Sequence, residues 1–144
     1  MEILNKKASY EYFIDGTLEC GISLWGSEVK SIRDGRCNIK EAWCRVQNGN
    51  LVIRGMHISK WGTANDFDVD EDRERQLLAH KKEIKKLDTL VQQKGVALVP
   101  LKLYFKDGKC KLLVGICRGK HVYDKRASLK EKQVSRDIAR SMKG

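Results

Sequence analysis

The sequence lacks any run of apolar residues near the roughly 20 needed to cross a membrane, and 33% of its residues are charged. Its first residues, "MEILNKKASY", lack the apolar core of a secretory signal peptide. It has one proline in 144 residues, no low-complexity tract and no internal repeat. We therefore expect a cytoplasmic protein without membrane contact, folded around a single core.

The sequence also lacks the residue patterns of common catalytic and metal sites. Its cysteines are odd in number, have no C-x-x-C spacing and lie mostly in apolar alternations, which favours free thiols packed as small hydrophobes. These cysteines are Cys20, Cys37, Cys44, Cys110 and Cys117. The three histidines are far apart in the sequence, and no nucleotide or metalloprotease motif is present. We expect no enzyme, no metal and no cofactor. A carboxylate pair in the acidic segment 65–75 is the weaker, catalytic alternative.

Positive charge is abundant and unevenly distributed. The formal net charge is +10, from 29 Lys and Arg against 19 Asp and Glu. Nine basic and three acidic residues lie between Arg118 and Gly144, whereas segment 65–75 has six acids and two bases. This asymmetry favours a polyanionic partner, which we take to be nucleic acid because nothing indicates a membrane.

Residues 10–58 alternate mostly with the period of two that is typical of β-strands. The stretches "WCRVQ" and "LVIRGMHI" flank "NGN", which predicts a hairpin because Asn and Gly tolerate positive φ. Between the strands, "GSEVKSIRDG" predicts one or two helical turns, with Ser27 as the N-cap and Gly35 at the end. The period changes in "RERQLLAHKKEIKKLDTLVQQKG", where apolar residues on one stripe predict an amphipathic helix, broken at most once, up to Gly95.

Two further strands, "VALVPLKLYF" and "CKLLVGIC", are joined by the turn "KDGK". Pro100 indicates an edge or a bulge in the first of them. The fold predicted is mainly β with helices: an OB-fold-type antiparallel barrel with an inserted amphipathic helix and a basic C-terminal tail. We expect the barrel in residues 1–120. Residues 121–144 have too few apolar side chains to offset an ordering entropy of roughly 1–2 kcal/mol per residue, so this tail should order only on a polyanion.

The residues themselves suggest an RNA-binding surface on the last two strands. Small barrels of this kind combine a basic groove with aromatic side chains that stack on bases. The candidate outward residues are Lys102, Tyr104, Lys106, Lys109 and Lys111, the candidate stacking residues are Trp25, Trp43 and Trp61, and the candidate phosphate contacts after the barrel are Arg118, Lys120, Lys125 and Arg126.

Six stretches resemble the SsrA-binding protein family, also called small protein B, essentially from end to end. They are "NKKASYEYFI", "GSEVKSIRDGR", "MHIS", "RQLLAHKKEI", "LVPLKLYFKDGKCK" and "RGKHVYDKR", in this order. The resemblance implies a monomeric barrel that binds the tRNA-like domain of transfer-messenger RNA. It also implies trans-translation, in which this RNA enters the decoding region and messenger channel of stalled ribosomes, and contact with elongation factor Tu through the RNA.

The resemblance also implies roles for individual residues. The RNA-binding residues implied are Glu19, Leu78, His80 and Lys111, to which the basic pattern adds Arg118 and Lys120. The ribosome-binding motif implied is Asp124, Lys125 and Arg126, with Tyr123 and Lys130 beside it. The chain departs from the family pattern at Ser9, Tyr10, Lys60, Trp61 and Ala79. Two rival functions remain at this level: a general RNA chaperone and a basic protein of the ribosome itself.

Overall fold

The computed structural model describes residues 2–60 and 70–119. The tail expected from residue 121, together with Lys120 and Trp61, lies outside these residues. The strands are β1 (Glu2–Leu4), β2 (Tyr12–Ile22), β3 (Cys37–Asn38), β4 (Trp43–Gln47), β5 (Asn50–Arg54), β6 (His57–Ile58), β7 (Arg75–Leu78), β8 (Ala97–Lys106) and β9 (Lys109–Gly119), and the helices are α1 (Lys6–Glu11), α2 (Gly26–Arg33) and α3 (Lys81–Lys94).

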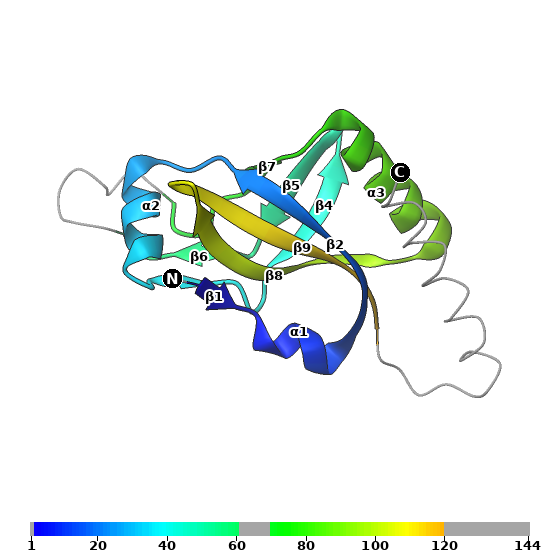
Figure 1. Cartoon of the computed structure of the whole chain (residues 1–144), viewed down its shortest axis with the longest axis horizontal. Helices are drawn as coiled ribbons and strands as arrows, with labels where there is room; N and C mark the ends of the chain where they lie inside the picture. The colour runs from blue at the N-terminus through cyan, green and yellow to red at the C-terminus, as the bar shows by residue number, and fades with distance from the viewer. Residues whose placement is uncertain (1, 61–69, 120–144) are drawn as a thin grey trace.

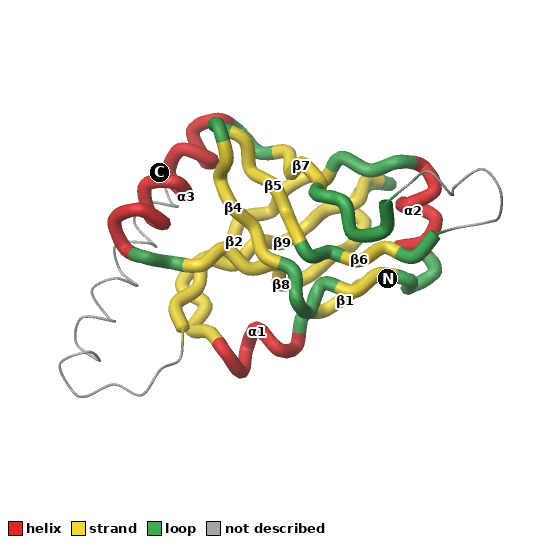
Figure 2. Tube along the Cα trace, turned by 180° about the vertical axis from the view of Figure 1, so that it is seen from behind, coloured by secondary structure: helices red, strands yellow, loops and turns green. Residues whose placement is uncertain are grey.

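Six strands close into a ring in the order β8–β4–β5–β7–β2–β9, because β9 pairs with both β2 and β8. β1 lies outside the ring and pairs with the second half of β8. Helices α2 and α3 lie at opposite ends of the strand ring (Figures 1 and 2). The closed antiparallel arrangement with a helix before the last strand pair confirms the predicted barrel architecture.

Alternation along the strands places one face of each in the core. On β2 the side chains of Leu18, Cys20 and Ile22 are buried, and on β9 those of Leu112 and Val114 are buried as well. Each large apolar side chain buried in this way contributes about 1.5–3 kcal/mol. The intervening residues of β2 and β9 therefore form the outer face of the barrel.

Both predicted tight turns are confirmed. Asn48 and Gly49 have φ values of 52° and 77°, and they join β4 to β5. Asp107 and Gly108 have φ values of 54° and 76°, and they join β8 to β9. Of the two alternatives predicted at Pro100, an edge or a bulge, the structure favours the bulge, because the β8–β9 register shifts between Pro100 and Lys102.

The long helix predicted from residue 73 is wrong in its first part, because residues 75–78 form strand β7. Arg75 and Leu77 are fully buried, whereas the residues between and after them are exposed. Such alternation suits a strand, and β7 closes the ring by pairing with both β5 and β2. Tertiary pairing thus overrides the helical spacing of the leucines, and helix α3 begins only at Lys81.

Two smaller predictions also need correction. The N-cap of α2 is Trp25 rather than Ser27, and the carboxylate of Glu28 accepts the Trp25 backbone N–H at 2.9 Å. The stretch "LVIRGMHI" is not one strand, because Gly55 ends β5 in a left-handed conformation with a φ of 76°. Any Cβ at Gly55 would lie 2.8 Å from the carbonyl oxygen of Glu41, so a side chain would also not fit there.

Among the described residues, no helix has both the length and the apolar composition needed to span a membrane. Within the same residues, no group of three His, Cys, Asp or Glu is placed to hold a metal ion. All five cysteines are free, and burial raises the pKa of each thiol, for Cys20 and Cys117 to about 12. They are packing residues rather than reactive thiols, as the sequence predicted.

Candidate RNA interface on the outer strand face

Strand pairing brings residues from five strands into one row on the outer face of the barrel. Leu78 of β7 lies opposite Gly21 of β2, and Gly21 lies opposite Lys111 of β9. Lys111 in turn lies opposite Tyr104 of β8, which pairs with Glu2 of β1. Leu78 and Lys111, which are 33 residues apart in sequence, are thus separated on the surface only by Gly21.

Glu19 lies on the same strand as Gly21, two residues earlier, and therefore on the same face. Its carboxylate accepts a hydrogen bond from the Tyr104 hydroxyl, and its other oxygen lies 3.6 Å from Nζ of Lys106. The Tyr104 hydrogen bond, together with the charges of Lys106 and Lys111, lowers the pKa of Glu19. Burial and the same hydrogen bond raise the pKa of Tyr104 to about 12. Glu19 is thus an ionised acceptor held in a fixed position.

Leu78 is an exposed apolar residue beside a hollow in the surface. The side chain is 54% exposed, although it follows the fully buried Leu77. A Cβ on Gly21 would lie 3.2 Å from the Leu78 Cβ. Because Gly21 has no side chain, the surface is hollowed at this position. The hollow has a volume of about 380 Å³ and is lined by Gly21, Leu24, Leu78, Lys109 and Lys111, among others. An apolar side chain and two cations around one hollow can hold the face of a base or ribose and its phosphate.

His80 is exposed at the start of α3, two residues after Leu78. Its backbone N–H donates to the Glu83 carboxylate at 3.3 Å, so the break between β7 and α3 is capped by Glu83. The imidazole is exposed, and its ring nitrogens are of the kind that can donate to or accept from RNA.

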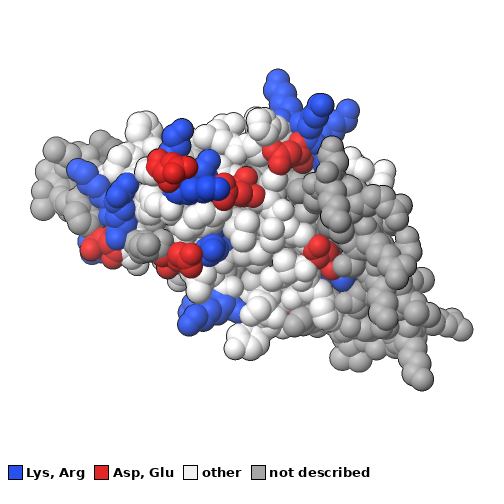
Figure 3. All heavy atoms as spheres, viewed as in Figure 1, with Lys and Arg blue, Asp and Glu red and all other residues white. Residues whose placement is uncertain are grey.

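Four lysines follow His80 in the first half of α3, and we call them the α3 lysine patch: Lys81, Lys82, Lys85 and Lys86. None of them has an acidic partner within 4.0 Å among the described residues. Cations near a helix N-terminus and like charges four residues apart are both unfavourable for the helix. Basic side chains gather near the start of α3, on the molecular face that carries β2 and β9 (Figure 3). The patch therefore offers phosphate contacts at the expense of helix stability.

Arg118 does not join this group, although the sequence suggested an RNA contact. It lies seven residues beyond Lys111 on β9, which is about 23 Å along an extended strand. Its guanidinium binds both carboxylate oxygens of Asp15, which is 5% exposed, and lies 5.6 Å from the ring centroid of Phe13. Arg118 thus fastens the end of β9 to β2. Lys120 and the predicted ribosome-binding residues lie outside the described residues.

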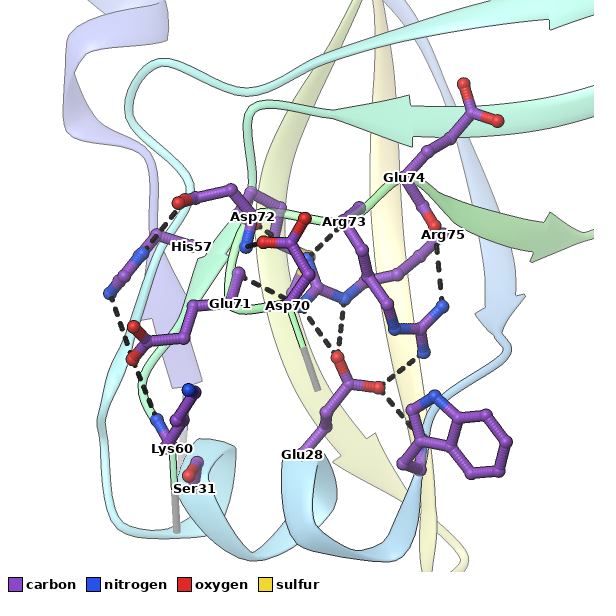
Figure 4. Close-up of polar contacts among 12 residues, drawn as sticks. Glu28, Ser31, His57, Lys60, Asp70, Glu71, Asp72, Arg73, Glu74 and Arg75 are labelled. Atoms are coloured by element: carbon purple, nitrogen blue, oxygen red, sulfur yellow. Dashed lines mark hydrogen bonds and ion pairs between the residues drawn. The ribbon is translucent and has the colours of Figure 1, made fainter. Parts of the chain in front are cut away.

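A buried ion cluster was missed by the sequence reading. The carboxylate of Glu28, 3% exposed, binds Arg75 at 2.6 and 2.8 Å and Arg73 at 2.5 Å (Figure 4). Burial alone would raise the pKa of Glu28, but hydrogen bonds from Arg73, Trp25 and Arg75 outweigh it and lower the pKa. The cluster joins α2 to β7, the strand that presents Leu78. The one sign of this cluster in the sequence is that Arg75 lies two residues before Leu77, so that in a strand both side chains point into the core.

Comparison with known proteins agrees with this geometry. The family model described as "SmpB protein" matches residues 2–144. The SsrA-binding proteins of Clostridium perfringens and Staphylococcus aureus strain Newman are each 50% identical over 139 residues, which is 96% of this chain and 89% and 90% of those proteins.

A chain from a solved structure described as "tmRNA-SmpB: a journey to the center of the bacterial ribosome" is 39% identical, with a TM-score of 0.70. The match covers 95% of this chain and 96% of that one. Both the sequence matches and the fold therefore extend over nearly the whole length, and the chain belongs to the SmpB protein family.

Proposed function

We propose that this protein binds the tRNA-like domain of transfer-messenger RNA and delivers it to stalled ribosomes for trans-translation. The carrying observation is the surface formed by Glu19, Leu78 and Lys111, continuous with His80 and the α3 lysine patch. The names of its relatives and the ribosomal complex of its structural neighbour support the choice of RNA. The proposed role is binding rather than catalysis, and the proposed location is the cytoplasm.

Each residue has a physical role in this proposal. Glu19 accepts hydrogen bonds from base edges, since its charge would repel phosphates. Lys111 and the α3 lysine patch neutralise phosphates, which gives affinity without sequence preference. Leu78 and the Gly21 hollow provide the apolar contact, and His80 adds a hydrogen bond beside it.

The tail has a separate role in the proposal. Tyr123, Asp124, Lys125, Arg126 and Lys130 are proposed to act in the decoding region and the empty messenger channel of the ribosome. We further propose that the protein acts as a monomer and that elongation factor Tu joins through the RNA. This arrangement would let one protein contact transfer-messenger RNA with its barrel and ribosomal RNA with its tail.

The test is a titration of the purified full-length protein with two RNAs of similar length and charge: the tRNA-like domain of transfer-messenger RNA and an ordinary transfer RNA. We expect much tighter binding of the first. Equal affinity for both would favour the general RNA chaperone, and stoichiometric presence on all ribosomes would favour a ribosomal protein. Sequencing of RNA recovered with the protein from cells provides a check that assumes no ligand.

A further inference from the structure

Trp25 presents a large aromatic surface to solvent on a rigid support. Its side chain is 61% exposed, yet its backbone N–H donates to the buried carboxylate of Glu28 at 2.9 Å. The same carboxylate binds Arg73 and Arg75, so the residue is anchored to the ion cluster of Figure 4. The backbone of this exposed tryptophan is therefore fixed before any ligand arrives, which lowers the entropy lost on binding.

Arg73 adds a cation to this aromatic surface. Its guanidinium carbon lies 5.8 Å from the Trp25 ring centroid, and its NH2 group is held by Glu28 at 2.5 Å. Tryptophan and arginine planes are the side chains on which unpaired bases stack. The pair therefore has the composition of a stacking platform for a nucleobase.

Beside this platform is a hollow of about 390 Å³ that is lined mostly by amides and other polar groups. Arg73 belongs to both, and Ser23, two residues before Trp25, also lines the hollow. Four of the lining residues are amides, beside the acidic Glu74, and amide donors and acceptors are of the kind that read base edges, above all those of adenine. They are Gln47, Asn48, Asn50 and Gln76.

We propose that Trp25, Arg73 and this amide-lined hollow form a subsite for one unpaired RNA base, preferably adenine. The inference rests on the proposed RNA-binding function. It adds an RNA contact separate from the row of paired residues that runs from Leu78 through Gly21 and Lys111 to Glu2. The base stacks on Trp25, and Asn50 and Gln76 read its edge. Their side chains already approach each other, with Gln76 Nε2 3.5 Å from Asn50 Oδ1, so both can face one ligand.

Trp43 is a matched control within the same chain. It is also exposed, at 44%, and also lies under an arginine, with the Arg45 guanidinium 5.7 Å from its ring. It borders a different groove, which is lined by residues of α1, α3, β4 and β8 and lacks the amide side chains of the other hollow. If Trp25→Ala lowers the RNA affinity and Trp43→Ala does not, the loss comes from the subsite rather than from nonspecific binding to any exposed tryptophan.

The experiment measures binding of the full-length protein to labelled hexamers of adenylate and uridylate and to the tRNA-like domain. We expect Trp25→Ala to weaken adenylate binding by about 5- to 150-fold, the value of one stacked base, and Trp25→Phe to weaken it less. Trp43→Ala should bind like the wild type. The double variant Asn50→Ala/Gln76→Ala should bind both hexamers equally. Since a stacked base carries no charge, Trp25→Ala should leave the salt dependence of binding unchanged.

Equal affinities of Trp25→Ala and Trp43→Ala for adenylate would overturn the subsite, provided that both variants melt near the wild type. An unchanged preference for adenylate in the Asn50 and Gln76 variant would overturn the role of the hollow. Failure of the wild type to bind the tRNA-like domain would instead refute the proposed function. The hexamer measurements would then still decide whether the subsite exists.

Discussion

Replacing Arg75 with methionine should destabilise the barrel far more than replacing any surface arginine. The side chain of Arg75 is fully buried and donates five hydrogen bonds, two to the Glu28 carboxylate and three to the backbone carbonyls of Met56, Glu71 and Arg73. Methionine fills much of the same volume but removes one of the two cations of the buried Glu28 carboxylate, together with two of its hydrogen bonds. Such a loss costs about 3–5 kcal/mol, which for a domain of this size corresponds to a fall in Tm of roughly 10–20 °C.

The assay is thermal and urea unfolding followed by circular dichroism, with Arg54→Met as the control. Arg54 also binds a carboxylate, that of Glu74 at 2.5 Å, but both side chains are exposed by about two fifths. A pair of this kind contributes about 0–1 kcal/mol, so the control should melt within a few degrees of the wild type. If the Arg75 and Arg54 variants melted at the same temperature, the structural importance assigned to the cluster would be refuted.

The double variant Glu28→Met/Arg75→Met separates two parts of this cost. Removing both charges eliminates the buried carboxylate that keeps only Arg73 as its cation, so the double variant should be more stable than Arg75→Met alone. It should remain less stable than the wild type, because the buried carbonyl of Met56 loses the donor that Arg75 supplied, at about 1–3 kcal/mol. The lowered pKa of Glu28 stabilises the wild type above its ordinary value of 4.5, and this contribution is lost as the pH falls through the lower folded value.

Three further predictions concern RNA and ribosome binding. Glu19→Ala should weaken binding of the tRNA-like domain by roughly 5- to 150-fold in a gel-shift titration, without a large change in Tm. The control Glu41→Ala removes a surface carboxylate that is also paired with a lysine, and it should change neither the affinity nor the Tm. Replacing two lysines of the α3 lysine patch by glutamine should flatten the slope of log K against log salt by about 1.5, and an unchanged slope would exclude phosphate contacts there. Ending the chain after Lys120 should leave binding of the tRNA-like domain within about threefold and abolish peptide tagging in reconstituted stalled translation, since coupling between distant sites is small. Full tagging by the truncated protein would contradict the ribosomal role of the tail.

The strands and their tight turns could be predicted because each depends on local information. Period-two alternation placed β2, β4, β8 and β9, and the pairs Asn48–Gly49 and Asp107–Gly108 joined them. Strand β7 was missed for a physical reason. The spacing of Leu77 and Ile84 fits a helix, and only the unpaired edges of β5 and β2, which no local pattern reveals, require a strand there.

The candidate site was predictable as a set of residues but not as a surface. The family resemblance implied Glu19, Leu78 and Lys111, and only the strand register shows that they surround Gly21. Arg118 was placed with them because of its charge, and the structure pairs it with Asp15 instead. The sequence also offered no reason to prefer one of the three tryptophans as a base-stacking residue. Only the structure shows that the backbone of Trp25 is bound by the buried carboxylate of Glu28 and that a polar hollow lies nearby.

Strand β9 limits how the distance between Lys111 and the residues after Gly119 can change in evolution. It carries Lys111 near one end and leads at Gly119 into residue 120 at the other, while pairing with β2 along most of its length. Deleting one residue between these points would turn every later side chain from one face of the barrel to the other. The strand can therefore lengthen or shorten only by two residues at a time, which is about 7 Å. A change of one residue would require a β-bulge to keep the later side chains on their faces.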